Sequence, residues 1–197
     1  MLNNKCQEIL NNHNNDHSAI LNKYPRFSYG VCLEIKTQIN NNDLDFNAII
    51  NRIALWKLNR TIVITDDLIP RIIALQDISS FEELLEKWND IADLLNNLIN
   101  TNGNCRGIRL PMASTIFHFY NPNIFPIIDR RAYYALFDTE FTDKMNKPVI
   151  GPAIYLDYIL KCKEYYDLYI PNGEIEFSDI DKFLYMVDDL SGHKIKY

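Results

Sequence analysis

The chain has no hydrophobic run long enough to cross a membrane. Nearly half of its 197 residues are apolar, but no stretch approaches the ~18 consecutive apolar residues that a spanning helix needs. The first twelve residues, MLNNKCQEILNN, contain no apolar core and no small-residue cleavage site, so they predict no secretory signal. We therefore expect a cytoplasmic protein without a membrane partner.

Cysteine is scarce, and the four cysteines are widely spaced. They are Cys6, Cys32, Cys105 and Cys162. Zinc and iron–sulfur sites normally take at least two ligands from within a few residues, and a disulfide framework is not expected without an export signal. The sequence therefore predicts isolated, buried or half-buried thiols, with no metal site and no iron–sulfur cluster.

Positive charge is in short supply, since the net charge is −6. An acidic chain is not expected to coat nucleic acid, although a local binding site remains compatible with it. Residues 101–135 differ from the rest, because Arg106, Arg109, Arg130 and Arg131 stand there against Asp129 alone, which gives a local charge of +3. The positive charge is thus concentrated in one segment.

Strand patterns are also lacking, apart from a β-branched stretch at 60–65 that is suited to a brief extended segment. Apolar residues recur instead at helical spacing, so we predict an all-α protein. The predicted helices cover residues 44–58, 66–75, 81–99, 110–120, 130–137, 151–169 and 178–192. Asp43 or Asp45, Thr65 and the pair Ser80 and Glu83 are suited to cap the first three. The asparagine-rich first fifteen residues are expected to fray at their start.

Residues 107–129, GIRLPMASTIFHFYNPNIFPIID, carry the strongest indication of function. A helix, a glycine-bearing turn and a second helix would direct backbone amides outward, where unpaired amides at a helix N-terminus attract phosphate. The segment ends at Asp129, directly before a helix, where the helix dipole favours an ionised carboxylate.

This segment resembles the helix-hairpin-helix DNA glycosylases of base-excision repair, the HhH-GPD superfamily. Those enzymes have a hairpin of the type LPGVGxKTA followed by a VD motif with a catalytic aspartate. Gly107-Ile108 stands at the GV of the hairpin, Ala113 at its final alanine and Ile128-Asp129 at the VD pair. The family's lysine position is occupied by Pro111, 18 residues before Asp129, which matches the family spacing.

The resemblance implies one monomeric unit of residues 1–197 with two helical lobes and a catalytic cleft between them. Lobe A would cover about 31–125, including the hairpin at 100–120, and lobe B about 1–30 plus 126–197. The implied partner is DNA with a flipped-out nucleotide, and no cofactor is implied beyond a monovalent cation that the hairpin is able to hold.

The implied activity is hydrolysis of an N-glycosidic bond. Asp129 would stabilise the positive charge that develops on the sugar and orient the attacking water. Because Pro111 cannot form a Schiff base, a monofunctional glycosylase without lyase activity is expected. Arg109 replaces the second hairpin glycine, so this turn is suited to contact phosphate through a side chain.

Further site residues are predicted with alternatives. Arg106, Gly107 and Arg109 would contact DNA phosphates, whereas Arg130 and Arg131 would do so or form solvated surface. Trp56, Lys57 and Tyr29 are candidates for the base pocket, although Trp56 is slightly better suited to the core or its boundary. No metal ligand is predicted, and His118 is interpreted as a packing residue.

Two other functions compete with this one. An aspartate before a helix is a common structural cap, so the chain could be an inactive helix-hairpin-helix module that binds nucleic acid. The overall acidity mildly favours a glycosylase that acts on RNA or modified nucleotides. The sequence does not indicate which base is removed.

Overall fold

The computed structural model describes residues 1–24, 26–41, 45–58, 62–100, 102–170 and 173–195, with the backbone alone for residues 26–32 and 58. In these ranges the fold is all-α, as the sequence predicts, and its only β-type pairing is an isolated antiparallel bridge between Val63 and Arg106. None of the helices in these ranges combines the length and apolarity that a membrane crossing requires. The α-helices are α1 (Asn4–Asn12), α2 (His17–Leu21), α3 (Arg26–Asn41), α4 (Phe46–Leu58), α5 (Ile69–Ile73), α6 (Phe81–Glu86), α7 (Trp88–Ile99), α8 (Leu110–Tyr120), α9 (Arg130–Phe137), α10 (Ile150–Tyr169) and α11 (Ile180–Leu190).

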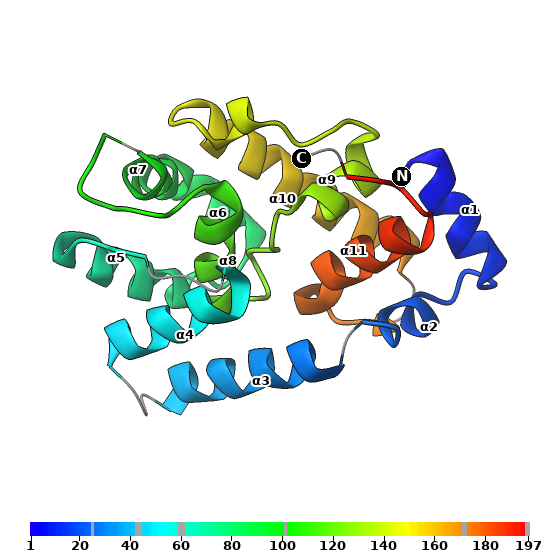
Figure 1. The fold of residues 1–197 in the computed structure, drawn as a ribbon, viewed down its shortest axis with the longest axis horizontal. Coiled ribbons are helices and arrows are strands. Elements are labelled where there is room, and N and C mark those ends of the chain that lie inside the picture. The colour runs from blue at the N-terminus through cyan, green and yellow to red at the C-terminus, as the bar shows by residue number, and fades with distance from the viewer. Residues whose placement is uncertain (25, 42–44, 59–61, 101, 171–172, 196–197) are drawn as a thin grey trace.

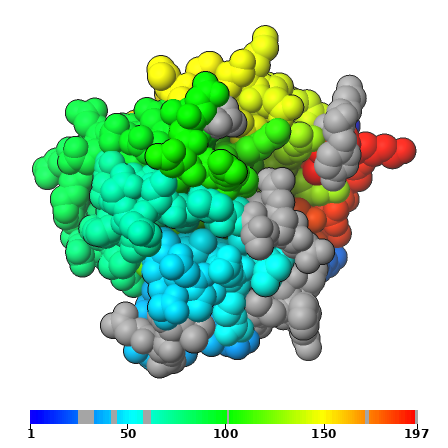
Figure 2. All heavy atoms as spheres, turned by 60° about the vertical axis from the view of Figure 1, so that its left-hand side comes forward, coloured from blue at the N-terminus to red at the C-terminus, as the bar shows by residue number. Residues whose placement is uncertain are grey.

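The helices lie in two groups that share one hydrophobic core (Figure 1). The first group consists of α3 to α8, and Figure 2 shows its residues, cyan to green, forming one continuous face. The second group consists of α1, α2, α9, α10 and α11, where α11 packs along α9 and also contacts α1 and α2. The chain passes from the first group to the second between α8 and α9, and α10 packs against α7 of the first group.

Side-chain caps explain several helix starts. The Oδ1 atom of Asp45 accepts a hydrogen bond from the Ala48 amide at 2.9 Å, and Ser80 Oγ accepts one from the Glu83 amide at 3.2 Å. The capping box differs from the prediction, because the Glu83 carboxylate accepts from the Ser79 amide and hydroxyl instead of from Ser80. Asp43 lies outside the described residues.

Three predictions about helices need correction. The single helix predicted over 81–99 is two helices, because Lys87 has a non-helical backbone (φ −89°, ψ 3°) that ends α6 and precedes α7. Thr65 makes no side-chain cap; the residues after it form the short 3-10 helices η1 (Asp66–Leu68) and η2 (Ala74–Asp77) on either side of α5. The first residues are also more ordered than predicted, since the Asn3 amide donates to the Ala135 carbonyl at 2.8 Å and its side chain caps α1.

Helix α8 lies at the centre of the first group. Every residue from Leu110 to Tyr120 is buried except Pro111, and the helix packs against α3, α4 and α7. Asn121 ends it and is itself buried. Its side-chain amide donates to the carbonyls of Leu75 at 2.9 Å and Ile78 at 2.8 Å, so it joins η2 to the end of α8.

Replacement of Asn121 by alanine should lower the free energy of unfolding by about 2–3 kcal/mol, because two buried carbonyls lose their donor. Urea denaturation followed by circular dichroism would measure this change. Asn123→Ala is the control, since Asn123 is exposed in the same loop and its loss should change stability by less than about 0.5 kcal/mol. Equal effects of the two substitutions would contradict the assigned role of Asn121.

Candidate functional site

The predicted hairpin connects α7 to α8. Gly107 has φ 77°, a left-handed conformation that glycine adopts without strain. The hairpin is tied to the segment before η1, because the amides and carbonyls of Val63 and Arg106 bond to each other at 3.0 Å in both directions. This bridge falls in the stretch for which the sequence predicts brief extension.

The backbone amides at the start of α8 are engaged within the protein. The Leu110 amide donates to Asn146 Oδ1 at 3.2 Å, Pro111 has no amide hydrogen, and the Met112 amide donates to the Arg109 carbonyl. The interpretation that these amides point freely outward therefore needs correction. Phosphate contact at this turn would depend mainly on side chains.

Two of the predicted DNA-contacting arginines are exposed at the hairpin. Arg106 is open to solvent, and Arg109 pairs with Asp143 at 3.1 Å while both side chains remain more than half exposed. An exposed ion pair of this kind contributes only about 0–1 kcal/mol. The Arg109 guanidinium can therefore exchange Asp143 for a phosphate at little cost.

The other two arginines begin α9, and Arg131 joins α9 to α11. Its guanidinium pairs with Asp188 and Asp189 at 3.0 Å each and donates to the His193 carbonyl at 3.2 Å. Asp188 is fully buried and also faces His193, whose other ring nitrogen pairs with Glu140. Arg131 thus has internal partners, and Arg130 is half-buried beside it.

Asp129 caps α9, as the sequence predicts. Its backbone is extended (φ −134°, ψ 175°), and its Oδ1 atom accepts a hydrogen bond from the Ala132 amide at 2.8 Å. The side chain is half-buried. One carboxylate oxygen is therefore used for the helix, while the residue keeps an accessible part.

Three side chains hold the residues immediately before Asp129. Tyr155 and Tyr158 of α10 donate to the carbonyls of Pro126 at 3.0 Å and Ile127 at 2.9 Å, and Ser114 of α8 accepts from the Ile128 amide at 3.2 Å. Both tyrosines are fully buried. For Tyr155 and Tyr158 this corrects the interpretation of the tyrosines of α10 as half-buried residues with hydrated hydroxyls, and it gives Asp129 a fixed position.

A second carboxylate lies near Asp129, and the sequence marks it only as part of a helix start. Asp181 of α11 is 5% exposed, and its Oδ1 atom has no hydrogen-bond partner among the described residues. Burial raises the pKa of Asp181 to about 6, and the charge of Asp129 acts in the same direction. Lys182, Lys36 and Lys57 oppose this shift.

The lysines near Asp181 come from both helix groups. Lys182 lies next to Asp181 on α11 and is buried in an ion pair with Asp179 at 2.6 Å, whereas Lys36 belongs to α3 and Lys57 lies in the last turn of α4. The charges of two lysines from the first group therefore influence Asp181. No sequence pattern predicts that these lysines lie near Asp181, because the residues involved are far apart in the chain.

His118 of α8 faces the same lysines. Its Nδ1 atom bonds to the Phe125 carbonyl at 2.9 Å, so Nδ1 carries the proton and Nε2 is an acceptor. Burial lowers the pKa of His118 well below its usual value, and Lys36, Lys182 and Lys57 act in the same direction. The imidazole is 1% exposed and Nε2 has no partner in the described part of the structure. His118 is buried, as its interpretation as a packing residue requires.

The predicted pocket residues are only partly brought together. Lys57 is half-buried and acts on both Asp181 and His118. Trp56 packs edge-on against Phe119 with ring centroids 5.6 Å apart, a contact typical of a core boundary. The Tyr29 side chain lies outside the described residues.

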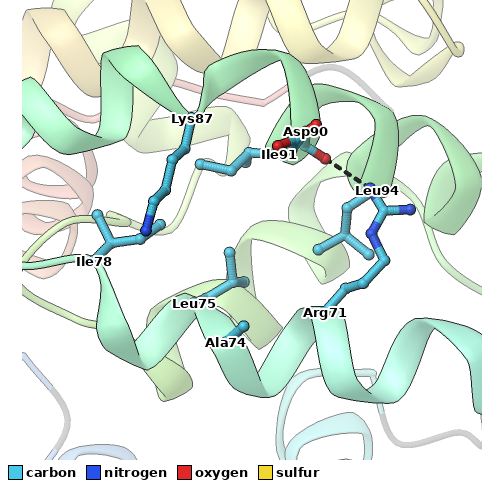
Figure 3. Close-up of a pocket in the computed structure, with 8 residues that line it drawn as sticks. All are labelled: Arg71, Ala74, Leu75, Ile78, Lys87, Asp90, Ile91 and Leu94. Carbon is cyan, nitrogen blue, oxygen red and sulfur yellow. Dashed lines mark hydrogen bonds between the residues drawn. The ribbon is translucent and has the colours of Figure 1, made fainter.

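Two cavities are lined by other parts of the molecule. One, of about 410 Å³, lies between η2 with the end of α5 and helix α7, where Arg71 donates to the Asp90 carbonyl across the opening (Figure 3). The other, of about 490 Å³, lies between α7 and α10. Neither Asp129 nor Asp181 lines either of them.

The donor set at the site contains no recognisable metal cage. Across the described ranges, no three histidine, cysteine, aspartate or glutamate side chains are grouped to hold an ion. The three cysteines whose side chains are described, Cys6, Cys105 and Cys162, are buried free thiols.

Comparisons with family models, curated proteins and solved structures return no match to this chain. The resemblance to the helix-hairpin-helix glycosylases thus depends on residues 107–129 alone and stays a prediction. The geometry around Asp129 and Asp181 is the independent ground for assigning a function.

Proposed function

We propose that the chain is a monofunctional DNA N-glycosylase that removes a damaged or modified base by hydrolysis, with Asp129 as the catalytic carboxylate. The observation that carries the proposal is the placement of Asp129. A half-buried carboxylate begins α9, directly after a segment held by Ser114, Tyr155 and Tyr158, and lies near the buried Asp181.

The two helix groups support a two-lobe arrangement. Helices α3 to α8 would form lobe A, and α1, α2, α9, α10 and α11 would form lobe B. Asp129 lies just after the chain crosses between them, and Asp181 on lobe B is influenced by Lys36 and Lys57 from lobe A. A flipped nucleotide would enter between the lobes, at the carboxylate pair.

The chemistry follows from one fixed negative charge. As the bond between the base and the sugar breaks, the bonding electrons leave with the base and positive charge develops on the sugar. The Asp129 Oδ1 atom is held by the Ala132 amide, which leaves Oδ2 to face the sugar and to orient the attacking water. The products are the free base and an abasic site.

A hydrolytic outcome is supported by Pro111. It occupies the first turn of α8, where the family's bifunctional members have a lysine nucleophile, and its nitrogen lies within the backbone. An imine between this residue and the sugar cannot form. Water is therefore the nucleophile in the proposed reaction.

Binding to DNA would start at the hairpin. Arg106 and Arg109 are exposed on either side of Gly107, and the weak ion pair of Arg109 with Asp143 can be replaced by a phosphate. Their contacts would offset the few kcal/mol that base flipping costs. Arg131 would instead hold α9 on α11, because of its pairs with Asp188 and Asp189.

Mass spectrometry of released bases tests the proposal. Duplex DNA carrying oxidised, deaminated, alkylated and naturally modified bases is incubated with the wild type, Asp129→Asn and Asp138→Asn. Asparagine caps helices as well as aspartate does, so Asp129→Asn removes the charge while the fold is kept. Asp138→Asn is the matched control, since Asp138 is an exposed residue at the other end of α9 with a left-handed backbone that asparagine tolerates.

The wild type and Asp138→Asn should release the same base, and Asp129→Asn should reduce the rate roughly a thousandfold. Equal rates for wild type and Asp129→Asn would refute the catalytic role. The cap bond from Ala132 favours a second candidate, a binding module without catalysis. Its result would be salt-dependent affinity for duplex DNA, no base release and no effect of Asp129→Asn on binding. RNA and free nucleosides in the same assay test a glycosylase for those substrates.

A further inference from the structure

Two buried acceptor atoms belong to side chains of α8 and α11 whose pKa values respond to the same lysines, Lys36, Lys57 and Lys182. They are Oδ1 of Asp181 and Nε2 of His118, and neither has a hydrogen-bond partner in the described structure. A third atom of this kind is Oδ1 of Asp188, whose Oδ2 atom bonds to Arg131 at 3.0 Å and to His193 Nδ1 at 3.2 Å. Leaving a buried acceptor unpaired costs about 1–3 kcal/mol, so a site that keeps two of them is suited to a ligand that supplies N–H groups.

The neighbours of Asp181 include lysines, but none of them bonds to its Oδ1 atom. Its own element contributes Lys182, which is engaged with Asp179 and the Ser178 carbonyl. Lys36, Lys57 and Asp129 influence it from the other elements packed there. These positive charges favour the carboxylate, yet none donates a described hydrogen bond to Oδ1. The Oδ1 atom is thus left without a donor near the proposed catalytic acid.

Resting on the proposed function, we infer that Asp181 reads the base: its carboxylate accepts a hydrogen bond from an N–H group of the nucleobase that is released at Asp129. In a nucleotide, the N–H groups of the natural bases lie on the edge used for pairing, and enzymes that flip a base read it there. The substrate class is therefore a base with an intact pairing edge that is damaged or modified elsewhere. Bases alkylated at the pairing-edge nitrogen are rejected.

Free bases added to a product-like complex test this assignment. The wild type, Asp181→Leu and Asp181→Asn are bound to a duplex with a cationic pyrrolidine abasic-site analogue, and affinity is measured with and without base. Two matched pairs differ by one N–H group: uracil with 3-methyluracil, and hypoxanthine with 1-methylhypoxanthine. At least one unmethylated base should tighten the wild-type complex roughly tenfold, and its methylated partner should not.

Asp181→Leu should remove the difference within that pair. Asp181→Asn keeps an acceptor oxygen, so it should retain part of the difference and lose its dependence on pH. In the wild type the tightening should weaken below about pH 6, where the carboxylate takes up a proton. Absence of tightening by every base, or unchanged discrimination in Asp181→Leu, would overturn the inference. If the preference for the cationic analogue persists in that case, the proposed function stands and only the base-reading role is lost.

Discussion

A duplex with a pyrrolidine abasic-site analogue should bind this protein at least roughly a hundredfold more tightly than one with the uncharged tetrahydrofuran analogue. The protonated ring nitrogen imitates the positive charge that the sugar acquires as the base leaves. Asp129 would be the group that responds to this charge, because its carboxylate begins α9 at a fixed position. Fluorescence anisotropy with labelled duplexes measures both affinities.

Asp129→Asn should bind both duplexes with nearly equal affinity. The Asp138→Asn protein should keep the preference, since Asp138 lies at the far end of α9. The comparison does not depend on the identity of the substrate base, because both analogues lack a base. A preference that survives in Asp129→Asn would assign the cation-stabilising charge to another residue and contradict the proposed mechanism.

Asp181→Asn should make the protein more stable at neutral pH, by about 2 kcal/mol in free energy of unfolding. Folding raises the pKa of Asp181 from 3.8 to about 6, so the folded state holds this proton more strongly than the unfolded state. The stability contributed by the protonated form is present below about pH 4 and is lost as the pH rises through 6. The gain from Asp181→Asn should therefore be full at pH 8 and vanish below pH 4.

Asp188→Asn is the matched comparison, because it changes another buried aspartate on the same helix. Asp188 pairs with Arg131 at 3.0 Å and with His193 at 3.1 Å, so its charge has partners that Asp181 lacks. Burial raises the pKa of Asp188 too, but its replacement leaves the mostly buried partners Arg131 and His193 uncompensated, so stability should fall by about 2 kcal/mol. Urea titrations at pH 4, 6 and 8 would measure both variants. Loss of stability in Asp181→Asn at pH 8 would contradict the description of Asp181 as an unsatisfied carboxylate.

Helices whose starts are marked by a capping residue or a proline could be predicted from the sequence. The prediction for α9 has the observed bounds because Asp129 is a strong cap, and α8 begins as predicted at the residue before Pro111. The first three helices were not predicted, although α1 and α2 begin at side-chain caps, Asn3 and Asp16. Helix α1 is held in part by contacts of Asn3 with Tyr134 and Ala135, more than a hundred residues later in the chain. The break between α6 and α7 at Lys87 likewise could not be predicted, because no glycine or proline lies there.

The site could be predicted only where its chemistry is local. Asp129 can be proposed from the spacing within residues 107–129, which lie in one continuous segment. Asp181 was missed as a functional candidate, because its burial and its unpaired oxygen arise from the packing of distant helices. The internal role of Arg131 could not be foreseen for the same reason, since its partner Asp188 is 57 residues away.

The anchoring of residues 126–128 has a consequence for catalysis. Water loses part of its stabilising effect on a developing charge because its dipoles must first reorient, whereas a preorganised group has no such cost. Ser114, Tyr155 and Tyr158 bind consecutive backbone groups leading to Asp129. In the proposed reaction the acid would thereby be set in place by the free protein itself, so substrate binding energy would remain for extruding the nucleotide.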